Sequence, residues 1–143
     1  MRVVFDTNTF VSHTILLHGA SDQLVNAWRA GIFELIVSAP ILEEYAQVLF
    51  LPGIRAISRL SDDEVQALLI RLEQFAVMAP AALTLDVVPS DPDDEKFLVA
   101  AIEGGADYLV SEDRHLRKFK EYMGIRILLP SRFLKVLEKS KFL

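Results

Sequence analysis

The sequence predicts an α/β fold, with one domain over residues 1–143 and a parallel sheet between layers of helices. Short apolar runs rich in β-branched residues alternate with segments of helical length, which is the pattern of consecutive strand–helix units. The runs show no alternation of apolar with polar residues, as expected for strands that are covered on both faces. A chain of 143 residues has the length of one domain, and no repeat or linker-like stretch divides it.

Five runs of strand length are expected to build the sheet. Each is apolar and ends close to residues that turn or cap the chain. The third is rich in β-formers and lies directly before Pro89. The five runs are residues 2–5, 33–37, 83–88, 108–111 and 125–129.

Capping residues delimit the helices between these runs. Ser61 is followed three residues later by Glu64, the pattern of a capping box. Asp91 is expected to cap a helix that has Pro92 at its first position. Ser21 is expected to cap the helical segment that follows the first strand. The expected helices cover about residues 12–30, 40–50, 61–77, 91–103 and 115–122, and a last helix follows residue 130.

The composition excludes several classes of protein. There is no cysteine, so neither a disulfide framework nor a thiolate metal site can form. Only three histidines are present, which argues against a His-rich zinc site. The longest apolar runs are far shorter than the ~20 residues that span a bilayer, and the first strand begins at residue 2. We therefore expect no membrane segment, no signal peptide and a cytoplasmic location.

The formal net charge is −5, but the two ends of the chain differ in sign. Residues 114–143 hold nine Lys or Arg and two Glu, a balance of +7, whereas residues 1–113 hold six and eighteen, a balance of −12. One interpretation is a solvated basic helix at the C-terminal end. The other is an acidic metal pocket whose basic rim attracts an anionic substrate.

Two acids follow predicted strands closely. Asp6 comes directly after the first run, and Asp113 lies just past the fourth. Because the C-terminal ends of parallel strands share one edge of a sheet, both acids can face the same crevice. Each also has an interpretation as a helix N-cap, although Asn8 or Thr9 could cap in place of Asp6.

Helical phase separates two further acids from their neighbours. At about 100° per residue, Glu44 lies roughly 110° from the centre of its apolar stripe and Glu43 roughly 150°, so Glu44 is nearer to the core. Asp94 shares a face with the apolar residues three, four, seven and eight positions later, and Asp93 does not. The alternative for residues 91–95 is an acid-rich first turn favoured by the helix dipole, which explains an inward Asp94 less well.

Four carboxylates at one sheet edge would form an oxygen-only site for a hard divalent cation. Mg²⁺ and Mn²⁺ prefer carboxylate and water oxygens, and such an ion can activate a water and neutralise charge on a phosphodiester. The candidate ligands and catalytic groups are Asp6, Glu44, Asp94 and Asp113. Asn8 and Ser111 could hold these carboxylates or waters in place.

Four stretches, taken together and in order, resemble the PIN domain family. This is a family of metal-dependent nucleases that includes the toxins of VapBC-type toxin–antitoxin pairs. The resemblance covers nearly the whole chain. The stretches are Val3-Val4-Phe5-Asp6-Thr7-Asn8, Ser38-Ala39-Pro40-Ile41-Leu42-Glu43-Glu44-Tyr45, Asp91-Pro92-Asp93-Asp94 and Ala106-Asp107-Tyr108-Leu109-Val110-Ser111-Glu112-Asp113.

The resemblance implies a three-layer sandwich with a five-stranded parallel sheet of order 3-2-1-4-5. It also implies Mg²⁺ or Mn²⁺ as cofactor and frequent homodimers. By position, the four acids of the family match Asp6, Glu44, Asp94 and Asp113, and Ser111 stands where the family often has Thr. The departure is Glu112, which replaces a commoner Gly and adds a charge.

The leading hypothesis is a metal-dependent endoribonuclease that serves as the toxin of a type II pair. Its partners would be RNA, a cognate antitoxin and further copies of itself, and Arg114, Arg117 and Lys118 are the candidate RNA contacts. A non-catalytic binding module is one alternative, with the acids as caps and surface charge. A phosphoaspartyl hydrolase is another, but Asn8 stands where that chemistry needs a general acid.

Overall fold

A computed structural model describes residues 1–85 and 92–140, and the α/β class is confirmed. Within these residues, six strands form one sheet in the order β3-β2-β1-β4-β6-β5. Neighbouring strands are parallel except for β5, which is antiparallel to β6. The strands are β1 (Arg2–Phe5), β2 (Glu34–Ser38), β3 (Val77–Ala79), β4 (Tyr108–Val110), β5 (Glu121–Tyr122) and β6 (Ile125–Leu128).

The five parallel strands have the expected 3-2-1-4-5 order, and the antiparallel β5 adds a sixth strand that was not predicted. A helix was predicted over residues 115–122, yet α7 (Arg114–Arg117) ends early. Met123 and Gly124 both have positive φ, at 50° and 82°. Two such residues form the type of turn that joins a tight hairpin, so the chain folds back and β5 pairs with β6.

The third strand also differs from the prediction. It is Val77–Ala79, which pairs with residues 36–38 of β2, and the preceding helix α5 (Asp62–Phe75) ends earlier than expected. Residues 83–85 of the predicted strand lie outside any strand, and residues 86–88 lie outside the described residues. A strand of three residues is too short to show a pattern in sequence.

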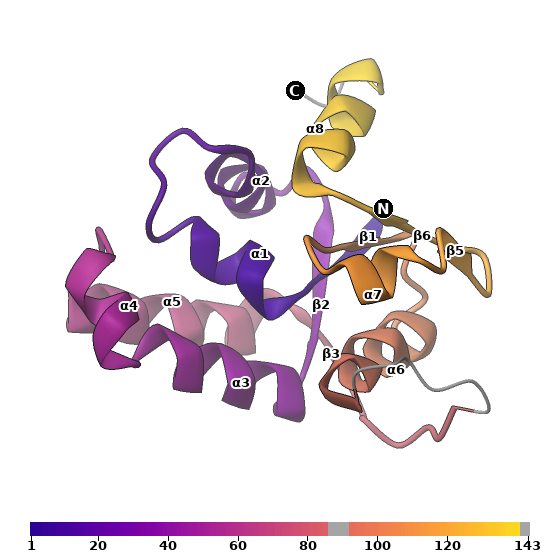
Figure 1. Cartoon of the computed structure of the whole chain (residues 1–143), viewed down its shortest axis with the longest axis horizontal. Coiled ribbons are helices and arrows are strands. Elements are labelled where there is room, and N and C mark those ends of the chain that lie inside the picture. The colour runs from indigo at the N-terminus through magenta and orange to yellow at the C-terminus, as the bar shows by residue number, and fades with distance from the viewer. Residues whose placement is uncertain (86–91, 141–143) are drawn as a thin grey trace.

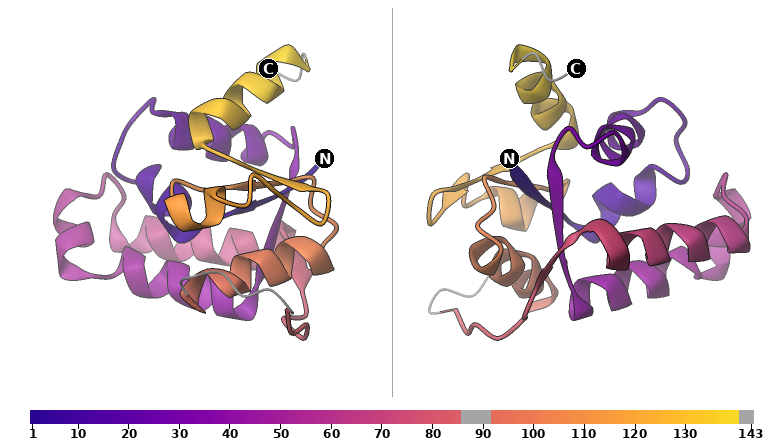
Figure 2. Two further views of the ribbon diagram at one scale, coloured as in Figure 1. Left: turned by 45° about the vertical axis from the view of Figure 1, so that its right-hand side comes forward. Right: turned by 180° about the vertical axis from the view of Figure 1, so that it is seen from behind.

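Helices cover both faces of the sheet (Figure 1). On one face α2 and α8 lie side by side, and on the other α6 packs on β1, β2 and β4. The helices α3 and α5 run next to each other away from the sheet (Figure 2). The remaining bounds are α1 (Thr7–Ser12), α2 (Ala20–Arg29), α3 (Ala39–Leu49), α4 (Pro52–Ile57), the 3-10 turn η1 (Pro92–Asp94), α6 (Glu95–Glu103) and α8 (Pro130–Lys139).

The helix predicted over residues 12–30 is shorter than expected: α1 begins directly after Asp6 and ends at Ser12, and α2 begins only at Ala20. His18 has a positive φ of 62° between them, and Gly19, not Ser21, is the N-cap of α2. Pro52 opens the short helix α4, which was not predicted. The Ser61 capping box is confirmed, and the predicted Asp91 cap lies outside the described residues.

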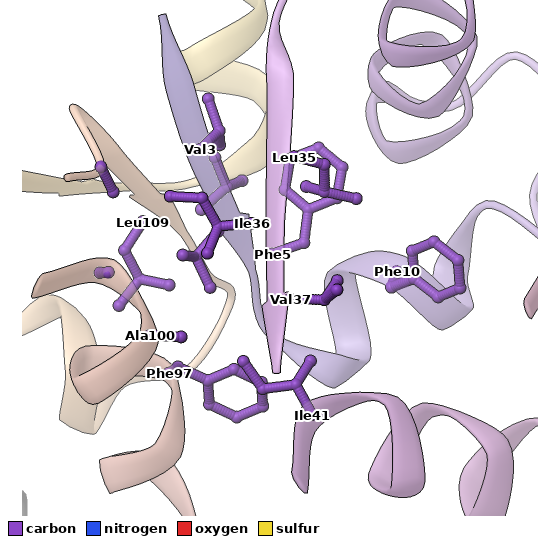
Figure 3. Close-up of a cluster of buried hydrophobic side chains, with 14 of the residues drawn as sticks. Val3, Phe5, Phe10, Leu35, Ile36, Val37, Ile41, Phe97, Ala100 and Leu109 are labelled. Carbon is purple, nitrogen blue, oxygen red and sulfur yellow. The ribbon is translucent and has the colours of Figure 1, made fainter. Parts of the chain in front are cut away.

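Two apolar layers hold these helices on the sheet. Figure 3 shows Ile36 and Ala100 on one side of β2, and Leu35 and Val37 on the other. All four side chains are fully buried, so both faces of the central strands are closed to water. The polar ends of the strands are therefore the part of the sheet that is available for chemistry.

Gly104, directly after α6, tests how closely that helix approaches β2. A methyl group added there would lie 2.8 Å from both Cδ1 and Cγ2 of Ile36. We expect Gly104→Ala to lower the free energy of unfolding by about 1–3 kcal/mol through overpacking, as measured by urea denaturation. The control is Gly53→Ala in α4, where nothing lies within 4 Å; it should be neutral or stabilising by up to ~1 kcal/mol. Equal effects of the two changes would contradict the close approach.

His13 is a buried histidine outside the predicted site, 5% exposed. Its ring packs edge-on against Phe10, and its Nδ1 lies against the Phe10 carbonyl oxygen. Since a carbonyl only accepts, Nδ1 carries a proton. Burial lowers the pKa of His13 to about 4.

The low pKa of His13 predicts a loss of stability in acid. Between pH 6.5 and 4 the unfolded chain binds a proton at this residue that the folded chain excludes, so stability falls as the pH falls through this range. The loss approaches about 3 kcal/mol at and below the folded-state pKa. We expect His13→Gln to have a shallower decline than wild type in urea titrations from neutral pH down to this range. The exposed His18→Gln control should keep the wild-type slope.

Candidate functional site

Asp6 lies at the point where β1 becomes α1, and only 4% of it is exposed. It is the N-cap of α1, and its Oδ1 accepts a hydrogen bond of 2.9 Å from the backbone N–H of Thr9. Its own backbone N–H donates to the carbonyl of Val110 at 3.1 Å. The start of a helix and the end of β4 thus hold this carboxylate at the C-terminal edge of the sheet.

Ser111 joins Asp6 to Asp113. Its hydroxyl donates to Oδ2 of Asp6 and accepts a hydrogen bond of 2.9 Å from the backbone N–H of Asp113. Asp113 in turn caps α7, because its Oδ1 accepts from the N–H of His115 at 2.8 Å. The Ser111 hydroxyl therefore contacts the carboxylate of Asp6 and the backbone of Asp113, and the cap geometry of each acid coexists with this link.

Glu44 reaches the same edge from the first turns of α3, which leaves β2 at the end of the sheet where α1 leaves β1 (Figure 1). Its Oε2 accepts a hydrogen bond from the hydroxyl of Thr7, the residue after Asp6. Glu43 is exposed and borders a groove between α3 and α5. Helical phase therefore distinguished the two glutamates correctly.

Tyr45 anchors this part of α3. Its hydroxyl donates to the carbonyl of Phe5 at the end of β1, and its ring stacks on that of Phe10 with the centroids 4.4 Å apart. Burial, with the added charges of Asp6 and Glu44, raises the pKa of Tyr45 well above its ordinary value of 10. The tyrosine is a neutral donor that fixes the position of the neighbouring Glu44.

Lys96 supplies a cation that the sequence interpretation missed. Its Nζ lies 2.6 Å from Oε1 of Glu44, and the two side chains are 22% and 23% exposed. It also lies over the ring of Phe97, at 5.9 Å from the centroid. The only signal in the sequence was a lysine inside an acid-rich first turn, where the helix dipole disfavours a positive charge.

Asp94 is buried at the junction of η1 and α6, with 6% of it exposed, while Asp93 is exposed. This is the inward orientation that helical phase predicted. Asp94 lies two residues before Lys96, whose ammonium contacts Glu44, so the start of α6 borders the same sheet edge.

The environment of Asp6 favours a nearby cation. Burial raises the pKa of Asp6, and the charge of Asp113 adds to this rise, while the hydrogen bonds from Ser111 and Thr9 oppose it. A buried carboxylate beside a second one is stabilised by a positive charge. Carboxylate oxygens are also the ligands that Mg²⁺ and Mn²⁺ prefer, so the chemistry of these donors fits such an ion.

The described residues nevertheless include no group of three or more His, Asp or Glu side chains close enough to hold a metal ion. Instead, Ser111 links the carboxylate of Asp6 to the backbone N–H of Asp113, and Glu44 is paired with Lys96. Binding by all four acids stays a prediction, and it requires side chains to move toward one another.

The other predicted residues lie around this edge. Asn8 is exposed in the first turn of α1. Arg114 and Lys118 are exposed at the two ends of α7, and Arg117 donates from Nη2 to the carbonyl of Glu112 at 3.5 Å. The side chain of Glu112 is exposed. Their roles toward a ligand stay predictions.

A basic groove of about 300 Å³ lies between β6 and α8. Within residues 1–85 and 92–140, none of its four cations forms an ion pair. The groove adjoins the candidate site, because the carbonyl of Leu128 accepts a hydrogen bond of 2.9 Å from the N–H of Ser111. Its lining consists of Arg126, Leu128, Arg132, Lys135, Val136 and Lys139.

No helix in the described part of the chain has both the length and the apolar character needed to cross a bilayer. A comparison with curated proteins gives no match. A comparison with protein families matches residues 2–115 to the PIN domain, a stretch that includes β1, α3, α6 and β4. PIN domains are generally nucleases that use divalent metal ions. The chain belongs to the PIN domain family.

Proposed function

We propose that this protein is an endoribonuclease that depends on Mg²⁺ or Mn²⁺. The observation that carries the proposal is the Ser111 hydroxyl, which contacts the carboxylate of Asp6 and the backbone N–H of Asp113, with Glu44 hydrogen-bonded to Thr7, the residue after Asp6. Membership of a family of nucleases supports hydrolysis of a phosphodiester. It favours this hypothesis over both a non-catalytic module and a phosphoaspartyl hydrolase.

The residues would divide the work as follows. Asp6, Glu44, Asp94 and Asp113 would supply oxygen ligands. When bound, the divalent ion would activate water and neutralise charge on the scissile phosphate. Ser111 would keep the carboxylates of Asp6 and Asp113 in register, and Arg114, Arg117 and Lys118 would contact the substrate near the end of β4.

The basic groove supports RNA as the substrate. Leu128 of its lining accepts a backbone hydrogen bond from Ser111. Its four cations, which form no ion pair within the described residues, suit the phosphates of a single strand. Glu121 lies opposite Arg126 in the β5–β6 pair, so we expect Arg132 and Lys135 of α8 to contribute most. The strand would run from the groove past Leu128 to the carboxylates.

The toxin role, the cognate antitoxin and the homodimer rest on the family resemblance. A short reading frame for a small antitoxin-like protein directly upstream would support the first two. Toxicity on expression that co-expression of that protein relieves would be the direct test. Light scattering on the purified chain would test the homodimer.

We expect Asp6→Asn to reduce Mn²⁺-dependent cleavage of a defined single-stranded RNA panel by on the order of a hundredfold or more. The fold should persist because Asn caps helices as well as Asp does. The measurements are cleavage on denaturing gels and circular dichroism of the variant. Full activity in the variant, or in excess EDTA, would show that the mechanism is wrong.

The adjacent glutamates provide a matched pair for the same assay. Glu44→Gln should lose activity to a similar extent, whereas Glu43→Gln changes the same charge on a side chain that faces solvent and should stay near wild type. Equal losses would point to a general effect of charge in α3.

Cleavage of single-stranded DNA as fast as RNA would contradict RNA as the preferred substrate.

Charge reversal in the groove should weaken RNA binding without disturbing the fold. In the Asp6→Asn background, Arg132→Glu with Lys135→Glu should reduce affinity for single-stranded RNA by about tenfold or more. The slope of log K against log salt should become shallower by ~0.7 for each phosphate that the protein no longer neutralises, or by about 1.4 for two. Fluorescence anisotropy at several salt concentrations measures both. Arg29→Glu with Arg71→Glu, at a different pocket, is the matched control, and an equal weakening there would contradict a specific groove.

A further inference from the structure

The ion pair between Lys96 and Glu44 differs from the other ion pairs of the described chain. Each of the other three has one side chain that is at least 33% exposed, whereas both members of this pair are at most 23% exposed. The ammonium and carboxylate are 2.6 Å apart. Such a pair is less screened by water and salt than a surface pair.

Both carboxylate oxygens of Glu44 have partners. Oε2 accepts from the Thr7 hydroxyl, and Oε1 accepts from Lys96. Oε2 is hydrogen-bonded to Thr7, the residue that follows Asp6. Oε1 is therefore the oxygen that a cation would bind. In this structure the ammonium of Lys96 has that position.

The local structure of α6 does not account for Lys96. It is the second residue of the helix, after Glu95, and a cation near a helix N-terminus is disfavoured by the macrodipole. The carboxylate of Glu44 on another helix is what stabilises it. The side chain of Lys96 also has a second position available that faces solvent. It borders a groove of about 310 Å³ whose lining includes Pro40 at the start of α3.

We propose that Lys96 is an internal substitute for the divalent cation, which must displace its ammonium from Glu44 in order to bind there. The inference rests on the proposed function, since it concerns the same metal site. Before the ion binds, Lys96 balances the charge of Glu44. The displaced side chain turns into the groove beside Pro40. Lys96 thus weakens metal affinity and makes loading depend on the metal concentration.

Replacement of Lys96 by Gln removes the charge and keeps most of the length. We expect Lys96→Gln to bind Mn²⁺ about tenfold more tightly than wild type, the size of a typical negative coupling between two ligands. In EDTA the same variant should unfold at a lower urea concentration, because Glu44 no longer has its partner, and Mn²⁺ should restore it. Isothermal titration calorimetry and urea denaturation measure the two effects.

Three comparisons make this experiment specific. Lys96→Arg keeps the charge and should retain the wild-type Mn²⁺ affinity within about threefold. Arg71→Gln removes a charge from the exposed face of α5 and should change neither quantity. In a Glu44→Gln background, Lys96→Gln should no longer tighten Mn²⁺ binding, because the competition is for that carboxylate.

The outcomes separate this inference from the proposed function. If wild type binds Mn²⁺ and Lys96→Gln binds it equally or more weakly, the pair is purely structural and the inference is wrong. If Lys96→Arg binds as tightly as Lys96→Gln, the charge is not the cause and the inference is again wrong. If no variant and no wild-type protein binds Mn²⁺ at millimolar concentration, the inference and the metal dependence of the proposed function both fail.

Discussion

The parallel pairing of β1 with β4 is the constraint on which the candidate site depends. Phe5 is in register with Val110, and the next residues, Asp6 and Ser111, therefore meet at the edge of the sheet. A slip of one residue would turn every side chain of a strand to the other face. Because both faces are packed with apolar side chains, this register is strongly favoured, and the apolar core thereby sets the position of the carboxylate.

The caps and the candidate ligands are the same residues. Asp6 caps α1 and Asp113 caps α7, so the simplest structural interpretation of each acid is correct. Each cap uses one carboxylate oxygen, Oδ1 in both cases. For Asp6, Oδ2 is directed to Ser111. Capping therefore orients each carboxylate and uses only one of its two oxygens. The same side chain can cap a helix and also bind a cation.

The sequence predicted those features that depend on a regular period. Strand–helix alternation indicated the fold class, and the family resemblance supplied the order of the parallel strands. Helical phase correctly oriented Glu44 and Asp94, because a position on a helix determines which side faces the core. The features it missed depend on short segments or on contacts between distant residues. The three residues of β3 carry no period, and β5 forms because Met123 and Gly124 adopt positive φ.

Lys96 belongs to the second kind of feature, since its partner is 52 residues away. The charge distribution indicated a different set of cations, the basic residues after position 113. The two sources of positive charge differ physically. The groove cations Arg132 and Lys135 are exposed to the salt solution, so their attraction for the proposed RNA substrate would be screened. Lys96 is largely covered and faces a fixed carboxylate, so its effect persists at salt concentrations that weaken the groove. If the substrate is RNA, as proposed, the two kinds of cation would have different tasks: Lys96 would balance the acidic site, and the groove cations would attract the strand.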